Sequence, residues 1–223
     1  MLYFEFQSTF KIMDNNISSV DELKTIRKFM EESSRFLSLS GLSGIFAGSL
    51  AIAGVLITYF FVLNSGSIPF DEFFRSLSQK GTNDLKWQLI LIALSILFLS
   101  ILSAFFFSFR KAKKAGQRIW TPVSKRLLIN LLIPLSTGGF FVIILLIQNH
   151  IQLIVPGMLI FYGLALVNAG KFTYNEVFYL GLLEIITGLI SAFYPNLGIF
   201  FWGFGFGILH IVYGLFMYRK YEA

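Results

Sequence analysis

The stretch Leu127–Gly170 reads LLINLLIPLSTGGFFVIILLIQNHIQLIVPGMLIFYGLALVNAG, which is 44 consecutive residues without Lys, Arg, Asp or Glu. A continuous helix of that length would be roughly 66 Å long, about twice the hydrocarbon thickness of a bilayer. Asn149 and His150 place a polar break near its middle. The stretch therefore predicts two membrane-spanning helices joined by a tight turn, and with them an integral membrane protein.

The composition of the whole chain fits this interpretation. Hydrophobic residues make up 56% of its 223 residues and charged residues 13%, against roughly 45–50% and about 25% in soluble domains. We predict an all-α membrane protein with a cytoplasmic N-terminal segment, 1–36, and one six-helix transmembrane domain, 37–223. The spans are expected at about Leu37–Val62, Trp87–Phe109, Leu127–Gln148, Ile151–Asn168, Val177–Tyr194 and Leu197–Tyr218.

The sequence contains no cysteine, which excludes disulfides, thiolate chemistry and Cys-ligated metals. Residues 1–12 lack the basic start, the apolar run and the small-residue cleavage site of a secretory signal peptide. Met13, which is followed by Asp14-Asn15-Asn16, is an alternative start of translation.

Basic residues are distributed unevenly between the two sides of the expected membrane domain. Only Arg75, Lys80 and Lys86 fall on one side, and the other fifteen Lys and Arg residues fall on the other. Cytoplasmic loops are enriched in Lys and Arg, so we expect both termini in the cytoplasm. The net charge of +6 is then an orientation signal and does not call for nucleic-acid binding. Anionic lipid headgroups are a further expected partner of the loop after the second span. The loop residues concerned are Arg110, Lys111, Lys113, Lys114 and Arg118.

A capping-box pattern near the N-terminus predicts a helix before the first span. Ser19 with Glu22 would begin this helix, which runs from Val20 to about Arg35. Its apolar residues recur on one side, so we expect an amphipathic helix on the cytoplasmic membrane surface.

Other local signals predict helix ends in the second half of the chain. Thr121-Pro122 is typical of an N-cap followed by proline at the first helical position. Gly170 can close the fourth helix, and Thr173 with Glu176 forms a capping box that would open the fifth. The connections here carry almost no charge, so we expect the last four helices to form one compact unit with the first pair attached.

Two ionisable residues, Glu184 and His210, fall inside the expected spans. Glu184 lies eight residues from Glu176 and His210 eight residues from Tyr218, so both lie about 12 Å from the cytoplasmic helix ends. The fifth and sixth helices are consecutive and antiparallel, and the two side chains can therefore meet. Buried ionisable groups in a membrane are costly and indicate a specific role.

Both residues lie on helix faces rich in small residues, which let helix backbones approach closely. Tyr162 lies at the same depth in the fourth helix, and Asn130 lies in the cytoplasmic half of the third, near the break expected at Pro134. A third stripe of small residues, on the first helix, would pack against a neighbour or mediate homo- or hetero-oligomerisation. The packing positions are Gly41, Gly44 and Gly48 in the first helix, Gly181 and Gly188 in the fifth, and Gly203, Gly207 and Gly214 in the sixth.

If Glu184 and His210 meet, two interpretations of the pair remain open; the third alternative is that they do not meet. In the first, they form a hydrogen-bonded pair that fixes helix packing. In the second, they form a proton-responsive or ligand-binding centre with Tyr162 and Asn130 around them. One Glu and one His are too few for a typical zinc site, and we expect neither a metal nor another cofactor. His150 is expected to be a solvated loop residue.

Four segments carry a resemblance to a known family. They are Arg35–Gly44 (RFLSLSGLSG), Arg126–Pro134 (RLLINLLIP), Phe161–Lys171 (FYGLALVNAGK) and Gly203–Tyr213 (GFGFGILHIVY). Together they resemble a family of small, uncharacterised bacterial inner-membrane proteins, over most of Lys28–Glu222. The resemblance implies a six-span architecture in the bacterial inner membrane and no assigned activity.

Three function classes follow from these features. The first is small-solute or proton-linked transport, or membrane-embedded sensing, centred on Glu184 and His210. The second is an accessory or structural subunit that docks onto a larger membrane complex through its small-residue faces. An enzyme is the least favoured class, because the sequence has no second intramembrane acid and no nucleophile motif of the G-x-S-x-G type. No catalytic residue is assigned.

Overall fold

A computed structural model describes residues 35–63 and 83–223, and every element in these ranges is a helix. The predicted surface helix from Val20 lies outside the described residues, apart from its last residue, Arg35. Within the described ranges, six helical segments are long and apolar enough to cross a membrane. The prediction of six spans in an all-helical membrane protein is confirmed.

The six spans are built from the following elements. The first is α2 (Gly41–Ile57) with its π-helical extension η1 (Thr58–Leu63), the second is α4 (Asn83–Lys114), and the third is α5 (Pro122–Ile147). The fourth is the 3-10 turn η4 (Ile151–Leu153) with α6 (Ile154–Gly170), and the fifth is α7 (Asn175–Phe193). The sixth is η5 (Pro195–Leu197), α8 (Gly198–Trp202), the π-helical η6 (Gly203–Leu209) and α9 (His210–Tyr221).

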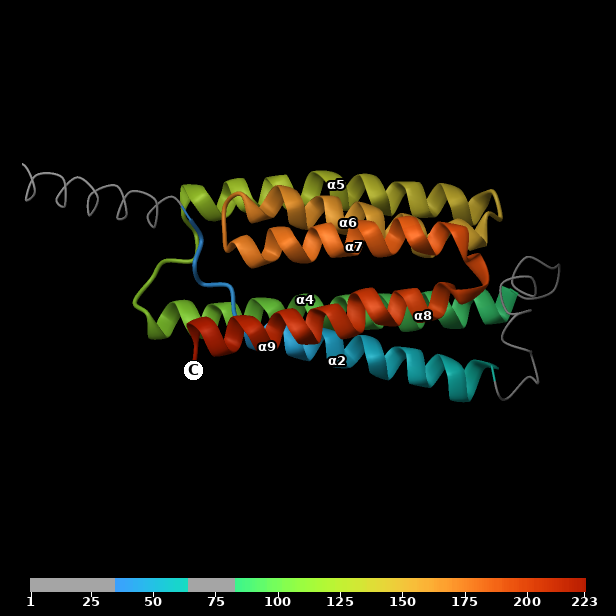
Figure 1. Ribbon diagram of the computed structural model, residues 1–223, viewed down its shortest axis with the longest axis horizontal. Helices are drawn as coiled ribbons and strands as arrows, with labels where there is room; N and C mark the ends of the chain where they lie inside the picture. The colour runs from blue at the N-terminus through green and yellow to red at the C-terminus, as the bar shows by residue number, and fades with distance from the viewer. Residues whose placement is uncertain (1–34, 64–82) are drawn as a thin grey trace, which may run out of the picture.

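The spans are arranged as two groups of three (Figure 1). In the α6-centred group, α6 packs against both α5 and α7. In the α2-centred group, α2 packs against both α4 and the sixth span, through η6 and α9. The groups meet where α6 and α7 face α8, η6 and α9, and we call this contact the seam. This grouping corrects the expectation that the last four helices form one unit, because the sixth span packs mainly on the first.

Glycine allows the closest helix contacts within each group. A Cβ atom at Gly48 of α2 would lie 2.6 Å from the carbonyl oxygen of Gly207 in η6, and one at Gly163 of α6 would lie 2.6 Å from that of Gly181 in α7. No real Cβ atom can come that close to a backbone oxygen. The small-residue stripe of the first helix, which includes Gly41, therefore packs inside the chain against η6 and α9.

One end of the bundle carries nearly all the charge among the described residues. This basic end, on the left in Figure 1, holds the C-terminus, the α4–α5 connection and the α6–α7 connection. The opposite end holds the turn at Asn149, whose side chain accepts a hydrogen bond of 3.0 Å from Lys86 Nζ. Between the ends, the outer faces of α4 and α5 expose large apolar side chains such as Phe98, Phe105 and Phe140, as helices facing lipid do. The basic residues are Arg35, Arg110, Lys111, Lys113, Lys114, Arg118, Lys125, Arg126, Lys171, Arg219 and Lys220.

The predicted start of α5 is confirmed. Thr121 is the N-cap and accepts a hydrogen bond of 3.1 Å from the backbone N–H of Ser124, whose hydroxyl accepts one of 2.8 Å from the backbone N–H of Thr121. Pro122 occupies the first turn, where its missing N–H costs nothing. The expected break at Pro134 does not occur, because α5 runs through it without interruption.

Candidate functional site

The seam holds the ionisable side chains that the sequence places within the membrane. Glu184 of α7 is 0% exposed, and His210, the first residue of α9, is 7% exposed. Tyr162 reaches the same place from α6. Each of the two helix groups therefore contributes to one buried polar centre, which we call the seam centre and which consists of Glu184, His210 and Tyr162.

The imidazole of His210 contacts both other residues of the seam centre. Its Nδ1 lies 3.0 Å from the carbonyl oxygen of Gly205 and 3.3 Å from Glu184 Oε1. Its Nε2 lies 2.8 Å from the hydroxyl of Tyr162. A carbonyl oxygen can only accept a hydrogen bond, so Nδ1 carries a proton. In the neutral ring, Nε2 is then the acceptor and the Tyr162 hydroxyl donates to it.

The Glu184 carboxyl, by contrast, lacks hydrogen bonds among the described residues. Within the part of the chain that the structure describes, neither Oε1 nor Oε2 has a hydrogen-bond partner, although both atoms are buried. The 3.3 Å contact with Nδ1 does not have hydrogen-bond geometry, because the Nδ1 proton is directed to Gly205. Leaving a buried carboxyl unsatisfied costs free energy, so a carboxyl in this state indicates a role beyond packing.

A glycine in the π-helical segment η6 makes room for the carboxyl. A Cβ atom at Gly205 would lie 2.6 Å from Glu184 Oε2 and 2.5 Å from Leu159 Cδ2. π-Helical turns inside membrane and soluble helices are frequent at functional sites. Here the turn directly precedes His210 and supplies the carbonyl to which its ring bonds.

Aromatic rings enclose the imidazole. The ring centroid of His210 lies 5.5 Å from that of Tyr162 and 6.1 Å from that of Phe206, and the latter two rings are 5.1 Å apart. Phe206 was not among the residues predicted from sequence. Its position four residues before His210, on the same helix face, is the signal that could have found it.

Asn130, the fourth residue expected at the centre, lies elsewhere. Its amide donates a hydrogen bond of 2.9 Å to the carbonyl of Arg126, on the preceding turn of α5. The contacts described above come from α6, α7, η6 and α9, and α5 supplies none of them. The structure thus brings together Glu184, His210 and Tyr162 without Asn130.

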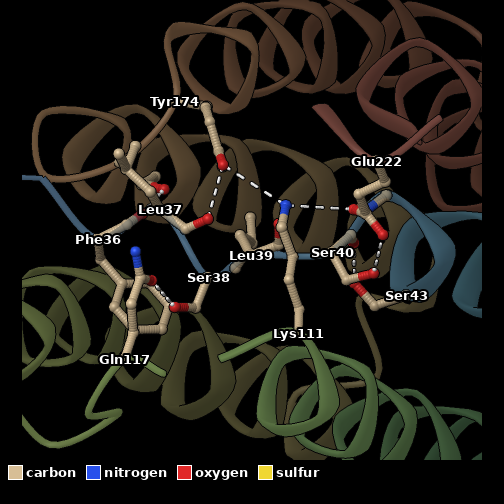
Figure 2. Close-up of polar contacts among 12 residues, drawn as sticks. Phe36, Leu37, Ser38, Leu39, Ser40, Ser43, Lys111, Gln117, Tyr174 and Glu222 are labelled. Atoms are coloured by element: carbon tan, nitrogen blue, oxygen red, sulfur yellow. Dashed lines mark hydrogen bonds and ion pairs between the residues drawn. The ribbon is translucent and has the colours of Figure 1, made fainter. Parts of the chain in front are cut away.

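A second polar network lies at the basic end, where the chain enters α2 (Figure 2). Residues 35–40 have no helical structure, so α2 begins at Gly41 and the span does not start at Leu37 as expected. We call residues 35–40 the strap. Its backbone carbonyls are held by side chains of α4 and of the α6–α7 connection, which compete successfully with helix formation.

Three contacts attach the strap to the connection between α6 and α7. The backbone N–H of Phe36 donates to the carbonyl of Phe172 over 2.7 Å, and the Thr173 hydroxyl donates to the carbonyl of Phe36 over 2.7 Å. The Tyr174 hydroxyl donates to the carbonyl of Leu37 over 2.6 Å. The predicted capping box of Thr173 is therefore wrong: Tyr174 is the N-cap of α7, and the Thr173 hydroxyl serves the strap.

Lys111 and Glu222 hold the other side of the strap. Lys111 Nζ donates 2.7 Å to the carbonyl of Leu39 and lies 3.3 Å from Glu222 Oε1. The Glu222 carboxylate also accepts from the Ser40 hydroxyl at 2.9 Å and from the backbone N–H of Gly41 at 2.6 Å. This places a negative charge at the N-terminus of α2, where the helix dipole favours it. Figure 2 shows Lys111 between Tyr174 and Glu222, so its side chain is already engaged within the chain.

Burial affects the pKa of Tyr174, which belongs to this network and lies between two spans. It raises the pKa of Tyr174 to about 12, and the nearby Tyr221, Glu222 and Glu176 act in the same direction. The hydroxyl therefore remains a hydrogen-bond donor to Leu37 throughout the neutral range.

The fold and the seam centre together define an α-helical, multi-pass membrane protein with a buried carboxyl–imidazole pair. No protein-family model matches the sequence, and no curated protein or solved structure matches it either. The resemblance to small bacterial inner-membrane proteins remains a prediction. Among the described residues, no group of three or more His, Cys, Asp or Glu side chains is arranged to hold a metal ion.

Proposed function

We propose that this protein carries out proton-linked transport, with Glu184 as the group that binds and releases the proton and His210 as its partner. The observation that supports this most strongly is the Glu184 carboxyl, which is completely buried, has no hydrogen-bond partner among the described residues, and lies 3.3 Å from His210 Nδ1. A purely structural carboxyl gains most from saturated hydrogen bonds. A carboxyl that must accept and lose a proton needs a free lone pair.

The arrangement of the helices supports a transport cycle. Each helix group is fixed internally by glycine contacts, such as Gly48 with Gly207 and Gly163 with Gly181. The seam centre lies between the groups, so a small rotation of one group against the other would change which end of the bundle reaches Glu184. Rocking of one rigid helix bundle against another is how many secondary transporters alternate access to a site near the midplane.

Proton flux in reconstituted liposomes tests this proposal. The purified protein is placed in vesicles that contain a pH-sensitive dye, and flux is started by a potassium diffusion potential. Because a positioned acid or base contributes two or more orders of magnitude, Glu184→Gln should slow the flux at least about tenfold. Asn130→Ala is the matched control, since it removes an intramembrane polar group outside the seam centre, and it should leave the flux unchanged.

Two results would overturn the proposal. One is a folded Glu184→Gln protein with the flux of the unchanged chain. The other is a flux no higher than that of empty vesicles, which would favour the alternative of an accessory subunit, with the Glu184–His210 pair serving packing only.

We further propose that the protein lies in a bacterial inner membrane with its basic end in the cytoplasm, as the distribution of Lys and Arg favours. A reporter fused after Tyr218 should then be active in the cytoplasm, and one inserted near Gly81 should be active outside. Both reporters on one side would contradict this orientation. Exposed basic residues at this end are expected to contact anionic lipid headgroups, whereas Lys111 is held by Glu222. The exposed residues concerned are Arg110, Lys113, Lys114 and Arg118.

A further inference from the structure

In the described residues, unsatisfied buried polar atoms occur in the seam centre and on one side of it. Four buried side-chain oxygens without a hydrogen-bond partner are found in the described residues: both carboxyl oxygens of Glu184, Oε2 of Glu176 and the hydroxyl of Tyr213. Glu176 lies in the first turn of α7 at the basic end, and Tyr213 lies one turn beyond His210 toward the same end. Two of these atoms therefore belong to the seam centre, and the other two lie between it and the basic end.

The other side of the seam centre differs. Thr187 and Ser191 continue the α7 face beyond Glu184, toward the opposite end, and both are buried. Their hydroxyls are satisfied within the helix: Thr187 donates to the carbonyl of Leu183 over 2.7 Å and Ser191 to that of Gly188 over 2.9 Å. These two hydroxyls need no further partner, whereas the Tyr213 hydroxyl on the basic side has none among the described residues.

Along α9, Tyr213 lies between His210 and the two residues that bond to Glu176, Lys220 and Tyr221. Its ring packs with Tyr162 against an apolar cluster formed by buried residues of both helix groups. The Tyr213 hydroxyl is thus a polar group set among apolar side chains. The cluster contains Leu166, Tyr174, Val177, Leu180 and Met217.

Buried polar groups without a protein partner are normally satisfied by water. The geometry points to a water-mediated proton path in which the Tyr213 hydroxyl relays protons between Glu184 and Glu176, and so between the seam centre and the basic end. In each transfer, the Tyr213 oxygen accepts a proton from the water on one side and releases its own hydroxyl proton to the water on the other. Tyr213 is neutral before and after, and one proton has moved. This inference rests on the proposed function and adds the route by which the proton arrives.

Glu176 would form the entrance of this path. Its Oε1 accepts hydrogen bonds of 2.7 Å from Lys220 Nζ and 3.1 Å from the Tyr221 hydroxyl, and this leaves Oε2 for water. The titratable groups that contact the two ends of this path are Tyr162 from α6 and His210 from α9 at Glu184, and Lys220 and Tyr221 from α9 at Glu176.

Hydrogen–deuterium exchange of the Glu184 carboxyl tests the relay directly. Infrared difference spectra of the full chain in vesicles, compared with those of Glu184→Gln, identify the Glu184 band. The exchange rate of this band is then measured after transfer to D₂O. Loss of a relay group should slow exchange at least about tenfold in Tyr213→Phe. The matched control is Tyr179→Phe, a tyrosine of α7 that is 62% exposed, and its exchange should equal that of the unchanged chain.

Glu176→Gln provides a second variant that keeps the acceptor for Lys220 and should also slow the exchange. Unchanged exchange in a folded Tyr213→Phe protein would overturn the relay and leave the proposed function standing, because Glu184 would still exchange. Failure of the Glu184 band to exchange in the unchanged chain would instead contradict the proposed function itself. Slow exchange in Tyr179→Phe as well would also overturn the relay, since the effect would then be general.

Discussion

Glu184 and His210 belong to different helix groups, and their side chains meet with Oε1 3.3 Å from Nδ1. Neither helix uses its glycine stripe for this contact. Gly181 and Gly188 of α7 pack on α6, and Gly207 and Gly214 of the sixth span pack on α2. The polar pair therefore occupies the seam between two tightly packed units, where relative movement of those units would act on it.

Gly205→Ala should disturb the seam centre without removing a titratable group. The added Cβ would lie 2.6 Å from Glu184 Oε2 and 2.5 Å from Leu159 Cδ2, so the carboxyl must move. Both atoms are ends of side chains that can shift, so we expect the lower end of the about 1–3 kcal/mol that overpacking costs. We expect a lower melting temperature in detergent and slower proton flux than in Gly139→Ala, whose Cβ would meet nothing within 4 Å. Equal behaviour of the two variants would contradict the packing of Gly205 against Glu184.

Replacing the glycines at the helix contacts within each group should destabilise the protein. Gly48→Ala and Gly163→Ala each place a Cβ atom 2.6 Å from a backbone oxygen of the neighbouring helix, which cannot move aside as a side chain can. We expect each to lower the free energy of unfolding by about 1–3 kcal/mol. Denaturant unfolding in micelles measures this, with Gly139→Ala again as the control. That control should be neutral or slightly stabilising, because alanine favours helix.

Much of the fold follows from hydropathy, but the partner of each helix face does not. The six spans and the meeting of Glu184 with His210 are predictable, since charge-free length and depth along a helix depend on local sequence alone. The glycine stripes of the first, fifth and sixth helices look alike in sequence, and nothing local says that the stripe around Gly207 packs against α2.

The strap and the start of α7 are not predictable for a related reason. Leu37 and Leu39 look like the start of an apolar helix, yet their carbonyls are held by Tyr174 and Lys111, which are distant in sequence. Thr173 fits a capping pattern, but its hydroxyl donates a hydrogen bond to the carbonyl of Phe36 instead. In each case a tertiary contact outweighs a local preference.

Glu222→Ala should release the strap. Its carboxylate accepts hydrogen bonds from Ser40 and from the Gly41 backbone and pairs with Lys111, whose side chain is only 19% exposed. Leaving such partly buried donors unsatisfied costs about 1–3 kcal/mol. Thermal unfolding in detergent should show this loss, and Glu222→Gln, which keeps one acceptor oxygen, should lose less. Arg219→Ala, at an exposed position nearby, should be close to neutral. A neutral Glu222→Ala would show that the network does not hold the strap.

Tyr174 should make the protein lose stability at high pH. Burial raises the pKa of its hydroxyl from 10.0 to about 12, so the folded state keeps a proton that the unfolded state releases between these values. Stability is unaffected below pH 10 and falls as the pH rises toward 12. The melting temperature in detergent, measured at pH 9 and pH 11, should fall more in the unchanged chain than in Tyr174→Phe. An equal fall in both would contradict this assignment.

The most direct test of the seam centre is solid-state NMR on the protein in lipid bilayers, with ¹³C-labelled glutamate and ¹⁵N-labelled histidine. His150→Gln leaves His210 as the single histidine of the chain. We predict a through-space transfer between the Glu184 carboxyl carbon and His210 Nδ1, which disappears in Glu184→Gln, and a ¹⁵N shift that shows the proton on Nδ1. Absence of the transfer, or a neutral ring with its proton on Nε2, would contradict the arrangement on which the proposed function depends.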